Sequence, residues 1–451
     1  MKKLFILAFA ALGIVACKEQ IVASVPACIK DGMIELRTPD REPGQVSALQ
    51  LACDPIDTVR IGFVGIGGRG CGAVSRFTQQ EGVRIVALCD LYQDQLDNGQ
   101  NILCEAGLPK AEEYVGEDSY KQMCERDDID LVYITTSWLA HTPISVYAME
   151  HGKHVACEVP AALSIDECWQ LVNTCEKTRR HFMMLENCCY DFYEMSALNM
   201  AQHGLFGEIY HVEGAYIHNL NSFWDGYIDN WRLSYNQAHR GDNYPTHGIG
   251  PICQVLGIHR GDRMDYVVSQ DTDSFAGLAK AREKMGSETF ADGDHTVSLI
   301  RTVKGKQIEI QHNVYSGRPY SRMYQITATD GFASKYPKPS FTLQPDPESF
   351  LSDRQVDSLL EAYKPSFVAE IEEKARKVGG HGGMDFIMDY RLIYCLRNGL
   401  PLDEDVYDAA EWSCLTELSG LSCTYGSMPV RVPDFTRGDW QKLDGFKYAE
   451  K

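Results

Sequence analysis

The sequence lacks the features that several functional classes require. It has no basic cluster, and 63 acidic residues outnumber 43 basic ones, which gives a net charge of -20. Because phosphate backbones bind to positively charged faces, this balance argues against a nucleic-acid partner. After the N-terminus no apolar run reaches the roughly eighteen residues of a membrane span, so we expect no transmembrane helix in the mature chain. No GxSxG nucleophile elbow is present, and no Ser/His/Asp arrangement stands out.

Metal-ligand and disulfide patterns are missing as well. The sixteen cysteines contain no CxxC pair, and no set of His, Cys and Asp has metal-ligand spacing, so we expect no metal. Cys89, Cys157 and Cys395 lie in apolar runs, where a free cysteine serves as a small core residue. Cys28 and Cys53 flank the segment before the first predicted strand and are the one pair to test for a disulfide.

The N-terminus has the pattern of an export signal. Lys2 and Lys3 precede a short apolar run that ends in "IVAC", which resembles a bacterial lipobox. The resemblance implies a lipoprotein signal peptide over residues 1–16, cleavage before Cys17, and lipidation of Cys17, including palmitate. A plain signal peptide with a chance cysteine is the alternative. We therefore expect an exported bacterial lipoprotein, lipid-anchored in the periplasm or at the cell surface.

The remaining chain divides into three parts. Residues 17–58 are turn-rich and are predicted to form an N-terminal extension. From residue 59, short apolar strands alternate with helices, which predicts a Rossmann doubly wound parallel sheet of the α/β class over residues 59–188. Beyond it, longer alternating strands and then helices predict an α+β domain over residues 189–451, with an open mixed or antiparallel sheet.

A glycine-rich turn follows the first predicted strand, "VRIGFVG". The GxGxxG pattern Gly65-Ile66-Gly67-Gly68-Arg69-Gly70 lies between that strand and a helix, as the dinucleotide-binding fingerprint requires. The early glycines let backbone N–H groups approach a pyrophosphate, and Gly70 lets the helix pack close to the strand. Asp90 ends the second predicted strand, where a carboxylate accepts the ribose hydroxyls and repels a 2′-phosphate. This arrangement favours NAD over NADP.

Three polar residues follow later strands at the same predicted edge. They are His141, Glu158 and Asn187, and ligands bind at the carboxyl ends of the strands in open α/β sheets. A helix-capping role is the alternative for His141.

The densest polar stretch is "WRLSYNQAHRGDNYPTHGIGP", residues 231–251. Its glycines and prolines predict a shaped loop rather than an amphipathic element, with Gly248 and Gly250 allowing a ligand to approach. Histidine is suited to acid/base work at neutral pH, so His247 is a candidate catalytic residue, and an incidental surface loop is the alternative. Tyr320, in "SGRPYSR", is a further candidate polar aromatic.

Together these pieces resemble the glucose–fructose oxidoreductase and inositol dehydrogenase superfamily. Within it, the chain is similar to glycoside hydrolase family 109, the NAD-dependent α-N-acetylgalactosaminidases. The resemblance runs from Cys53 to Gly426 and rests on segments such as "AMEHGKHVACEVPAAL", "ENCCY", "NYPTHGIGP" and "GGHGGMDF". Where dehydrogenase relatives have Glu-Lys-Pro, with a lysine that assists proton transfer, this chain reads Glu158-Val159-Pro160, as the hydrolase branch does.

The resemblance implies a glycosidase that uses tightly bound NAD without consuming it. NAD⁺ takes a hydride from carbon 3 of the sugar, and the resulting ketone acidifies the hydrogen on carbon 2. Elimination then expels the glycosidic oxygen, water adds, and the retained NADH reduces the ketone, so no net oxidation occurs.

The resemblance also assigns residues. Catalytic roles fall on His247 and Tyr190, with Tyr320 close by. NAD contacts fall on the glycine loop and the strand ends: Gly65, Gly67, Gly68, Arg69, Gly70, Asp90, Trp138, His141, Glu158, Val159 and Asn187. Contacts with the carbohydrate or glycoconjugate substrate fall on Tyr190, Arg232, Tyr244, Pro245, Thr246, His247 and Tyr320.

Two alternatives stand beside this interpretation. The chain could be an exported NAD-dependent sugar oxidoreductase, against which Val159 argues because the usual base is missing. It could also be a non-catalytic sugar-binding lipoprotein that holds NAD structurally, against which the intact "YPTHG" stretch argues. The sequence leaves open whether the chain forms a homo-oligomer.

Overall fold

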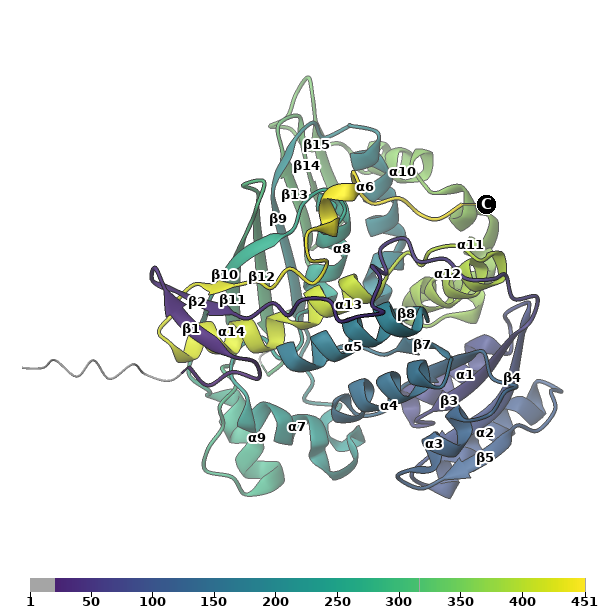
Figure 1. The fold of residues 1–451 in the computed structure, drawn as a ribbon. Coiled ribbons are helices and arrows are strands. Elements are labelled where there is room, and N and C mark those ends of the chain that lie inside the picture. The colour runs from purple at the N-terminus through teal and green to yellow at the C-terminus, as the bar shows by residue number, and fades with distance from the viewer. Residues whose placement is uncertain (1–20, 316, 451) are drawn as a thin grey trace, which may run out of the picture.

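A computed structural model describes residues 21–315 and 317–450, which form two β-sheets with their covering helices (Figure 1). The predicted signal peptide and the predicted lipidation site, Cys17, lie outside the described residues. The fifteen cysteines of the described part are free thiols, including Cys28 and Cys53.

The predicted Rossmann sheet is confirmed. Its six strands are all parallel and have the order β5-β4-β3-β6-β7-β8. The strands are β3 Val59–Val64, β4 Val83–Asp90, β5 Glu112–Val115, β6 Leu131–Ile134, β7 His154–Cys157 and β8 Phe182–Met184. The helices are α1 Gly68–Phe77, α2 Gln93–Glu105, α3 Ser119–Cys124, α4 Trp138–Glu150 and α5 Ile165–Thr178. The central strands β6 and β7 are buried throughout, as expected for a sheet covered on both faces.

The second sheet has ten strands in the order β1-β2-β16-β10-β11-β12-β9-β13-β14-β15. Most neighbours are antiparallel, whereas β12 runs parallel to β9 and β16 runs parallel to β2, so the predicted mixed sheet is confirmed. The strands are β1 Ala27–Lys30, β2 Met33–Leu36, β9 Ile209–Ile217, β10 Met264–Asp271, β11 Thr296–Thr302, β12 Gln307–Asn313, β13 Tyr324–Ala328, β14 Gly331–Ser334, β15 Ser340–Leu343 and β16 Val430–Arg431.

Helices pack on one face of this sheet, where α8 contacts β9 and α14 contacts β10. The helices after β8 are α6 Phe192–Gln202, α7 Trp231–Ala238, α8 Thr246–Leu256, α9 Ala276–Met285, α10 Asp353–Ala362, α11 Ser366–Val378, α12 Met384–Asn398, α13 Val406–Ser413 and α14 Leu415–Thr424. Short 3-10 turns are η1 Asn187–Tyr190, η2 Trp224–Gly226, η3 Ile228–Asn230, η4 His381–Gly383 and η5 Asp439–Lys442.

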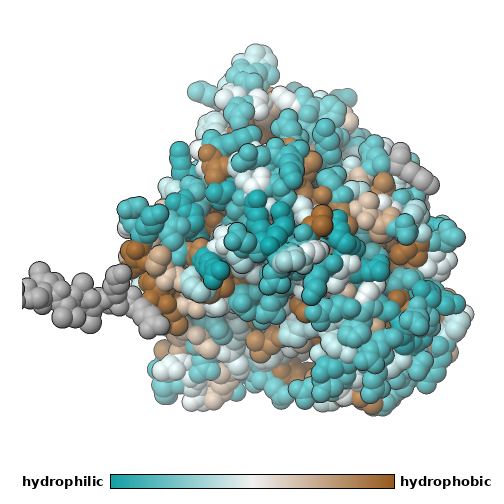
Figure 2. Space-filling view, viewed as in Figure 1, coloured by the Kyte–Doolittle hydropathy of each residue, from teal (hydrophilic) through white to brown (hydrophobic). Residues whose placement is uncertain are grey.

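The predicted N-terminal extension carries two strands of the second sheet. The hairpin of β1 and β2 lies at the edge of the second sheet (Figure 1). It joins this sheet through β16, where Ile34 pairs with Val430. In the view of Figure 2 the surface is predominantly hydrophilic, and hydrophobic residues gather on the side where β1 and β2 lie. Ile29 of β1 and the preceding Val22 are exposed. The part of the chain that is described contains no helix long and apolar enough to cross a membrane.

Candidate functional site

The carboxyl ends of the parallel strands bring the predicted cofactor residues to one edge. The glycine turn follows β3, Asp90 ends β4, Trp138 opens α4 after β6, Glu158 follows β7, and Asn187 follows β8. All five strands run in the same direction, so these residues lie along a single side of the sheet.

The glycine turn has the shape needed to hold a dinucleotide. Gly65 has φ +88°, and a Cβ there would lie 2.9 Å from the backbone of Thr135. At Gly70 a Cβ would collide with the carbonyl oxygen of Gly65, which explains the close approach of α1 to β3. Gly67 and Gly68, by contrast, face open space at the N-terminus of α1, where no side chain caps the helix. Backbone N–H groups at such a terminus bind a pyrophosphate, so these residues fit NAD.

Asp90 fixes the turn from the neighbouring strand. Its carboxylate accepts hydrogen bonds from the N–H groups of Ile66, at 2.6 Å, and Tyr92, at 3.0 Å. It therefore lies directly beside the glycine loop, as its predicted contact with the ribose requires.

An ion-pair network joins the glycine turn to the second domain. Arg69 contacts Glu158, with 2.5 Å between Nε and Oε1, and Asp385 of α12, with 2.7 Å between Nη1 and Oδ2. Asn187 donates to Asp385 at 2.6 Å. Burial alone would raise the pKa of Asp385, but the hydrogen bond from His381 and nearby guanidinium charges hold it well below its usual range. Sequence reasoning missed Asp385 because it lies far along the chain.

Two predicted cofactor residues make their main contacts with the protein itself. Both ring nitrogens of buried His141 lie near carbonyl oxygens, those of Pro160 at 2.7 Å and Thr136 at 3.1 Å. The imidazole therefore connects the loops after β6 and β7. Because both ring nitrogens already have protein partners, they do not favour a hydrogen bond with NAD. Val159 is buried beside these loops and carries no titratable group to this edge.

An aromatic cage surrounds the predicted substrate residue Arg232. Trp138 and Tyr244 stack on each other, with ring centroids 5.4 Å apart, and the guanidinium lies 4.8 Å and 4.7 Å from their centroids. Arg232 also donates to the hydroxyl of Tyr227 at 2.8 Å. Its Nε is buried and has no partner in the described residues. The cage thus links the first domain to the "YPTHG" segment and leaves one donor for a ligand.

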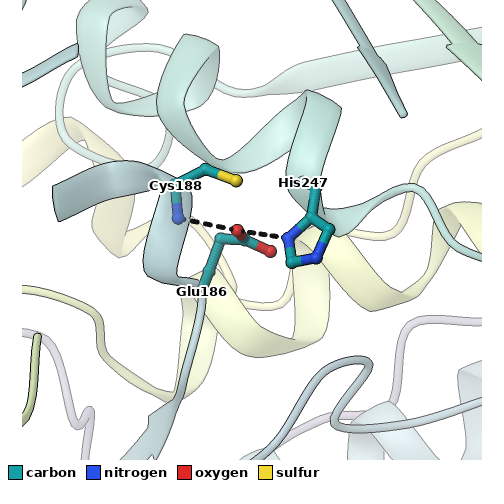
Figure 3. A group of neighbouring side chains, drawn as sticks. All are labelled: Glu186, Cys188 and His247. Carbon is teal, nitrogen blue, oxygen red and sulfur yellow. Dashed lines mark hydrogen bonds and ion pairs between the residues drawn. The ribbon is translucent and has the colours of Figure 1, made fainter. Parts of the chain in front are cut away.

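The centre of the site is a carboxylate–imidazole pair, Glu186 and His247, which we call the dyad. The sequence analysis predicted His247 but not Glu186. Oε1 of Glu186 lies 2.7 Å from Nδ1 of His247, and both side chains are buried (Figure 3). Glu186 precedes Asn187 at the end of β8, so its strand-end position was the available signal. Of the two imidazole nitrogens, only Nδ1 has a hydrogen-bond partner in the described part of the chain.

The protonation of this pair follows from its surroundings. Burial, together with the positive charge of Arg322, lowers the pKa of His247 below its ordinary 6.5, although Glu186 opposes this shift. Burial alone would raise the pKa of Glu186, but His247, the N–H of Cys188 and the charge of Arg322 together lower it. At neutral pH the carboxylate is therefore ionised and the imidazole neutral. A carboxylate that accepts from Nδ1–H fixes the tautomer in which Nε2 is a proton acceptor.

The predicted loop over residues 231–251 is wrong. Residues 231–238 form α7, and α8 begins at Thr246, directly after Pro245. The glycines of α8 serve packing rather than ligand approach. A Cβ on Gly214 of β9 would collide with the carbonyl of Gly248, and one on Gly250 would lie 2.8 Å from Cγ of Glu186. Small residues therefore let α8 lie against β9 and bring His247 to the carboxylate.

Tyr190, one of the two predicted catalytic tyrosines, lies among other residues than His247. Its hydroxyl is buried without a partner in the described residues, and its electrostatic neighbours are Glu404, Asp403, Tyr448 and Arg391 rather than His247. Tyr190 is the last residue of η1, and its side chain is fully buried.

The tyrosine rings that contact His247 come from other elements. The centroids of Tyr216 on β9 and Tyr244 lie 5.1 Å and 5.0 Å from the imidazole. The hydroxyl of Tyr216 is hydrogen-bonded to Nδ1 of His218 at 2.8 Å. Tyr320 contacts the ring of His218 at 4.9 Å, so His218 and Tyr216 lie between Tyr320 and His247 in this series of ring contacts. Sequence reasoning missed Tyr216 because it appears as an ordinary strand aromatic.

The dyad also forms a set of three metal-type ligands with Cys188. Their ligand atoms lie within 4.8 Å of one another (Figure 3). The guanidinium of Arg322, however, lies 3.2 Å from the Cys188 sulfur. A cation here would meet a buried positive charge, so the electrostatics oppose a metal.

A pocket of about 1000 Å³ lies away from Glu186 and His247 and is lined by Gln254, Arg260 and the C-terminal segment.

Comparison with known proteins matches both halves of the chain. Residues 59–186 match the oxidoreductase family with an NAD-binding Rossmann fold, and residues 190–442 match the glycosyl hydrolase 109 C-terminal domain. The chain is 53% identical over 466 residues to "Glycosyl hydrolase family 109 protein 1" of Bacteroides thetaiotaomicron, covering 100% of this chain and 99% of that protein. It is 52% identical over 414 residues to an "Alpha-N-acetylgalactosaminidase" of Bacteroides fragilis, covering 89% and 97%.

Solved structures resemble the fold at low sequence identity. A levoglucosan dehydrogenase in complex with NADH and L-sorbose aligns with a TM-score of 0.65 at 15% identity, covering 84% of this chain and 100% of that one. A scyllo-inositol dehydrogenase from Lactobacillus casei with bound NAD(H) and scyllo-inositol aligns with a TM-score of 0.59 at 16% identity, covering 83% and 99%. At this identity the likeness establishes the two-domain fold.

Proposed function

The chain belongs to glycosyl hydrolase family 109, and from that premise we propose that it removes terminal α-linked N-acetylgalactosamine from glycoconjugates. It is an NAD-dependent glycoside hydrolase, because the family domain follows an NAD-binding Rossmann domain in one chain. The observation that carries the proposal is the buried pair of Glu186 and His247 at the NAD-binding edge, where Val159 supplies no base.

His247 is assigned the transfer of the sugar proton. When bound, NAD supplies reversible hydride transfer at a sugar carbon. Neutral Nε2 of His247 takes a carbon-bound proton, and ionised Glu186 stabilises the imidazolium that results. The aromatic rings of Tyr216 and Tyr244 beside the imidazole exclude water from it. Arg232 and the buried hydroxyl of Thr246, which has no partner among the described residues, are assigned to the substrate.

The glycine turn, Asp90 and the residues around Asn187 would hold the cofactor. Gly67, Gly68 and the first N–H groups of α1 would bind the pyrophosphate, and Asp90 the adenosine ribose. Arg69 lies between the turn and α12, so it would close the cofactor site against the second domain. Because NAD is scarce outside the cytoplasm, an exported enzyme of this kind would carry its NAD tightly bound.

The proposal is tested with purified protein and no added cofactor. The protein is incubated with 4-nitrophenyl α-N-acetylgalactosaminide in deuterated water, and nitrophenol and deuterium at carbon 2 of the released sugar are measured. We expect release with deuterium incorporated, and neither in the His247→Gln variant. Accumulation of NADH without nitrophenol would instead support a sugar oxidoreductase, and absence of both signals would refute the substrate.

We also propose that the chain is exported and anchored through a lipid on Cys17. The support is the lipobox-like "IVAC" and the exposed apolar Val22 and Ile29 at the start of the described chain. Labelling cells with a palmitate analogue tests this, since wild-type protein should take up the label and the Cys17→Ala variant should not. Equal labelling of the two proteins would refute the anchor.

A further inference from the structure

A row of aromatic side chains leads from the buried dyad to the surface. We call it the aromatic rim, and its members are His218, Phe223, Tyr320 and Tyr336. The His218 ring contacts Phe223 with centroids 5.3 Å apart and Tyr320 at 4.9 Å, and Tyr320 contacts Tyr336 at 6.3 Å. The members come from three separate segments of the chain, so sequence alone does not place them together.

The rim is connected to the catalytic histidine through Tyr216. The Tyr216 ring lies 5.1 Å from that of His247 and 5.6 Å from that of His218. Ring contacts therefore run from His247 past Tyr216 to the rim. This makes the rim a candidate surface for the group attached to the terminal sugar, the aglycone.

Two members of the rim expose large apolar area to solvent. Phe223 is 50% exposed and Tyr320 is 43% exposed. Phe223 nevertheless sits in a well-fixed segment, because its neighbour Trp224 is buried and stacks on Tyr315 at 5.8 Å. The N–H of nearby Leu220 donates to the carbonyl of Val314 at 3.0 Å. These contacts fix the segment that carries Phe223, so its exposed ring forms a preformed contact surface.

Two cations, Lys335 and Arg322, lie beside rings of the rim. Lys335 lies 5.7 Å from the Tyr336 ring centroid, and its ammonium is paired with Glu194 at 2.7 Å and Asp191 at 3.0 Å. Burial lowers the pKa of His218 to about 4, so the ring is neutral at physiological pH. The guanidinium of Arg322 lies 5.9 Å from the Tyr320 ring centroid, and its Nε is buried without a partner among the described residues. The aromatic rings themselves are neutral and can stack on the apolar faces of sugars.

We propose that the aromatic rim is a subsite for the sugar next to the one that is removed, with the exposed ring of Phe223 as its main stacking surface. The inference rests on the proposed glycosidase function and narrows its substrate class to oligosaccharides and glycans, in which a second sugar follows the one that is removed. A ring that packs on this sugar stabilises the bound glycan and leaves the chemistry at His247 unchanged.

The test compares two substrates of the full-length enzyme. One is a trisaccharide with a terminal α-N-acetylgalactosamine, and the other is N-acetyl-α-galactosaminyl fluoride, whose leaving group has no surface to stack. For Phe223→Ala we expect kcat/KM for the trisaccharide to fall about tenfold. The loss should fall mostly on KM, because the variant loses the apolar contact between the phenyl ring and the bound sugar. With the fluoride we expect kcat/KM to stay within about twofold of wild type.

The controls use residues of matched chemistry. Phe275 is 72% exposed at the start of α9 and outside the rim, so Phe275→Ala should leave both substrates unaffected. Phe223→Trp should restore trisaccharide activity. An equal loss with both substrates, or no loss with either, would overturn the subsite. A wild-type enzyme inactive on both substrates would refute the proposed function, and with it this inference.

Discussion

Replacing Glu186 by glutamine tests the role assigned to the dyad. Glutamine keeps the size of the side chain, and its carbonyl oxygen can still accept the hydrogen bond that Oε1 receives from the N–H of Cys188 at 3.1 Å. The variant loses only the negative charge 2.7 Å from Nδ1 of His247. That charge matters most when the imidazole has taken up a proton, so the loss falls on the transition state more than on the bound substrate.

The size of the effect follows from the burial of the pair. Two unit charges about 4 Å apart interact with roughly 4 kcal/mol at the effective dielectric constant suited to protein sites. Because about 1.4 kcal/mol corresponds to a factor of ten in rate, we expect kcat to fall about a thousandfold in Glu186→Gln. Hydrolysis of the 4-nitrophenyl glycoside measures this directly, and retained thermal stability shows that the fold is intact.

The pH profile gives a second reading of the same change. Activity requires neutral His247, whose pKa is below 6.5, so the wild-type acid limb should lie below that pH. Glu186 raises the pKa of His247, and removing its charge lowers it further, so the acid limb of Glu186→Gln should move to lower pH. In a His247→Gln background the Glu186 substitution should cost nothing more, because the two residues act as a unit.

A neighbouring glutamate provides the control. Glu404 accepts a hydrogen bond from the N–H of Glu186 at 3.2 Å, and burial together with the charge of Glu186 raises its pKa well above the usual range. The shift favours the protonated form, which glutamine mimics, so Glu404→Gln should retain activity within about threefold. Equal losses in the two variants, or a Glu186→Gln enzyme with wild-type kinetics and pH profile, would refute the proposed dyad.

Three further predictions concern separate parts of the structure. Tyr216→Phe removes the hydrogen bond to His218 and should lower kcat/KM about tenfold in the same assay, with unchanged melting temperature. Gly70→Ala forces a collision between α1 and the preceding turn and should destabilise the protein by about 1–3 kcal/mol in urea unfolding, whereas Gly68→Ala, which faces open space, should not. His259 is buried between Asp408 and Glu411, and although burial opposes it, these carboxylates raise its pKa to about 10. Its stabilisation is complete below pH 6.5 and is lost as pH rises towards 10, so the unfolding free energy should fall over this range in wild type and less in His259→Gln.

The first domain was predictable because its signals are local. Each main strand is a short apolar run bounded by turn residues, and β4 ends at Asp90, as the sequence predicts. The strand β5 was missed because "EEYV" is short, polar and partly exposed. The pairing of Ile34 with Val430 was not predictable either, since it joins segments nearly at opposite ends of the chain.

The site was predictable only where a residue type itself indicates chemistry. His247 and Asn187 were found in this way, and the structure places Asn187 just after β8 and His247 in the first turn of α8. Glu186, Tyr216 and Asp385 were missed because a glutamate, a strand tyrosine and a helical aspartate are ordinary until the fold brings them together. Tyr190 was predicted for its place in "ENCCY", but a single turn of 3-10 helix decides which way it points.

The glycines of "THGIGP", which the sequence analysis assigned to a loop, matter for both the fold and the site. Their composition is typical of a loop, yet tertiary packing overrides it, since Gly214 and Gly248 let α8 lie directly on β9. A bulkier pair would push α8 away from the sheet, and His247 would lose its 2.7 Å contact with Glu186. The same close packing places Tyr216 of β9 against the imidazole. Val159 replaces the lysine of the dehydrogenase relatives, and in the proposed mechanism His247 serves as the base instead. The position of this base depends on how closely α8 packs on β9.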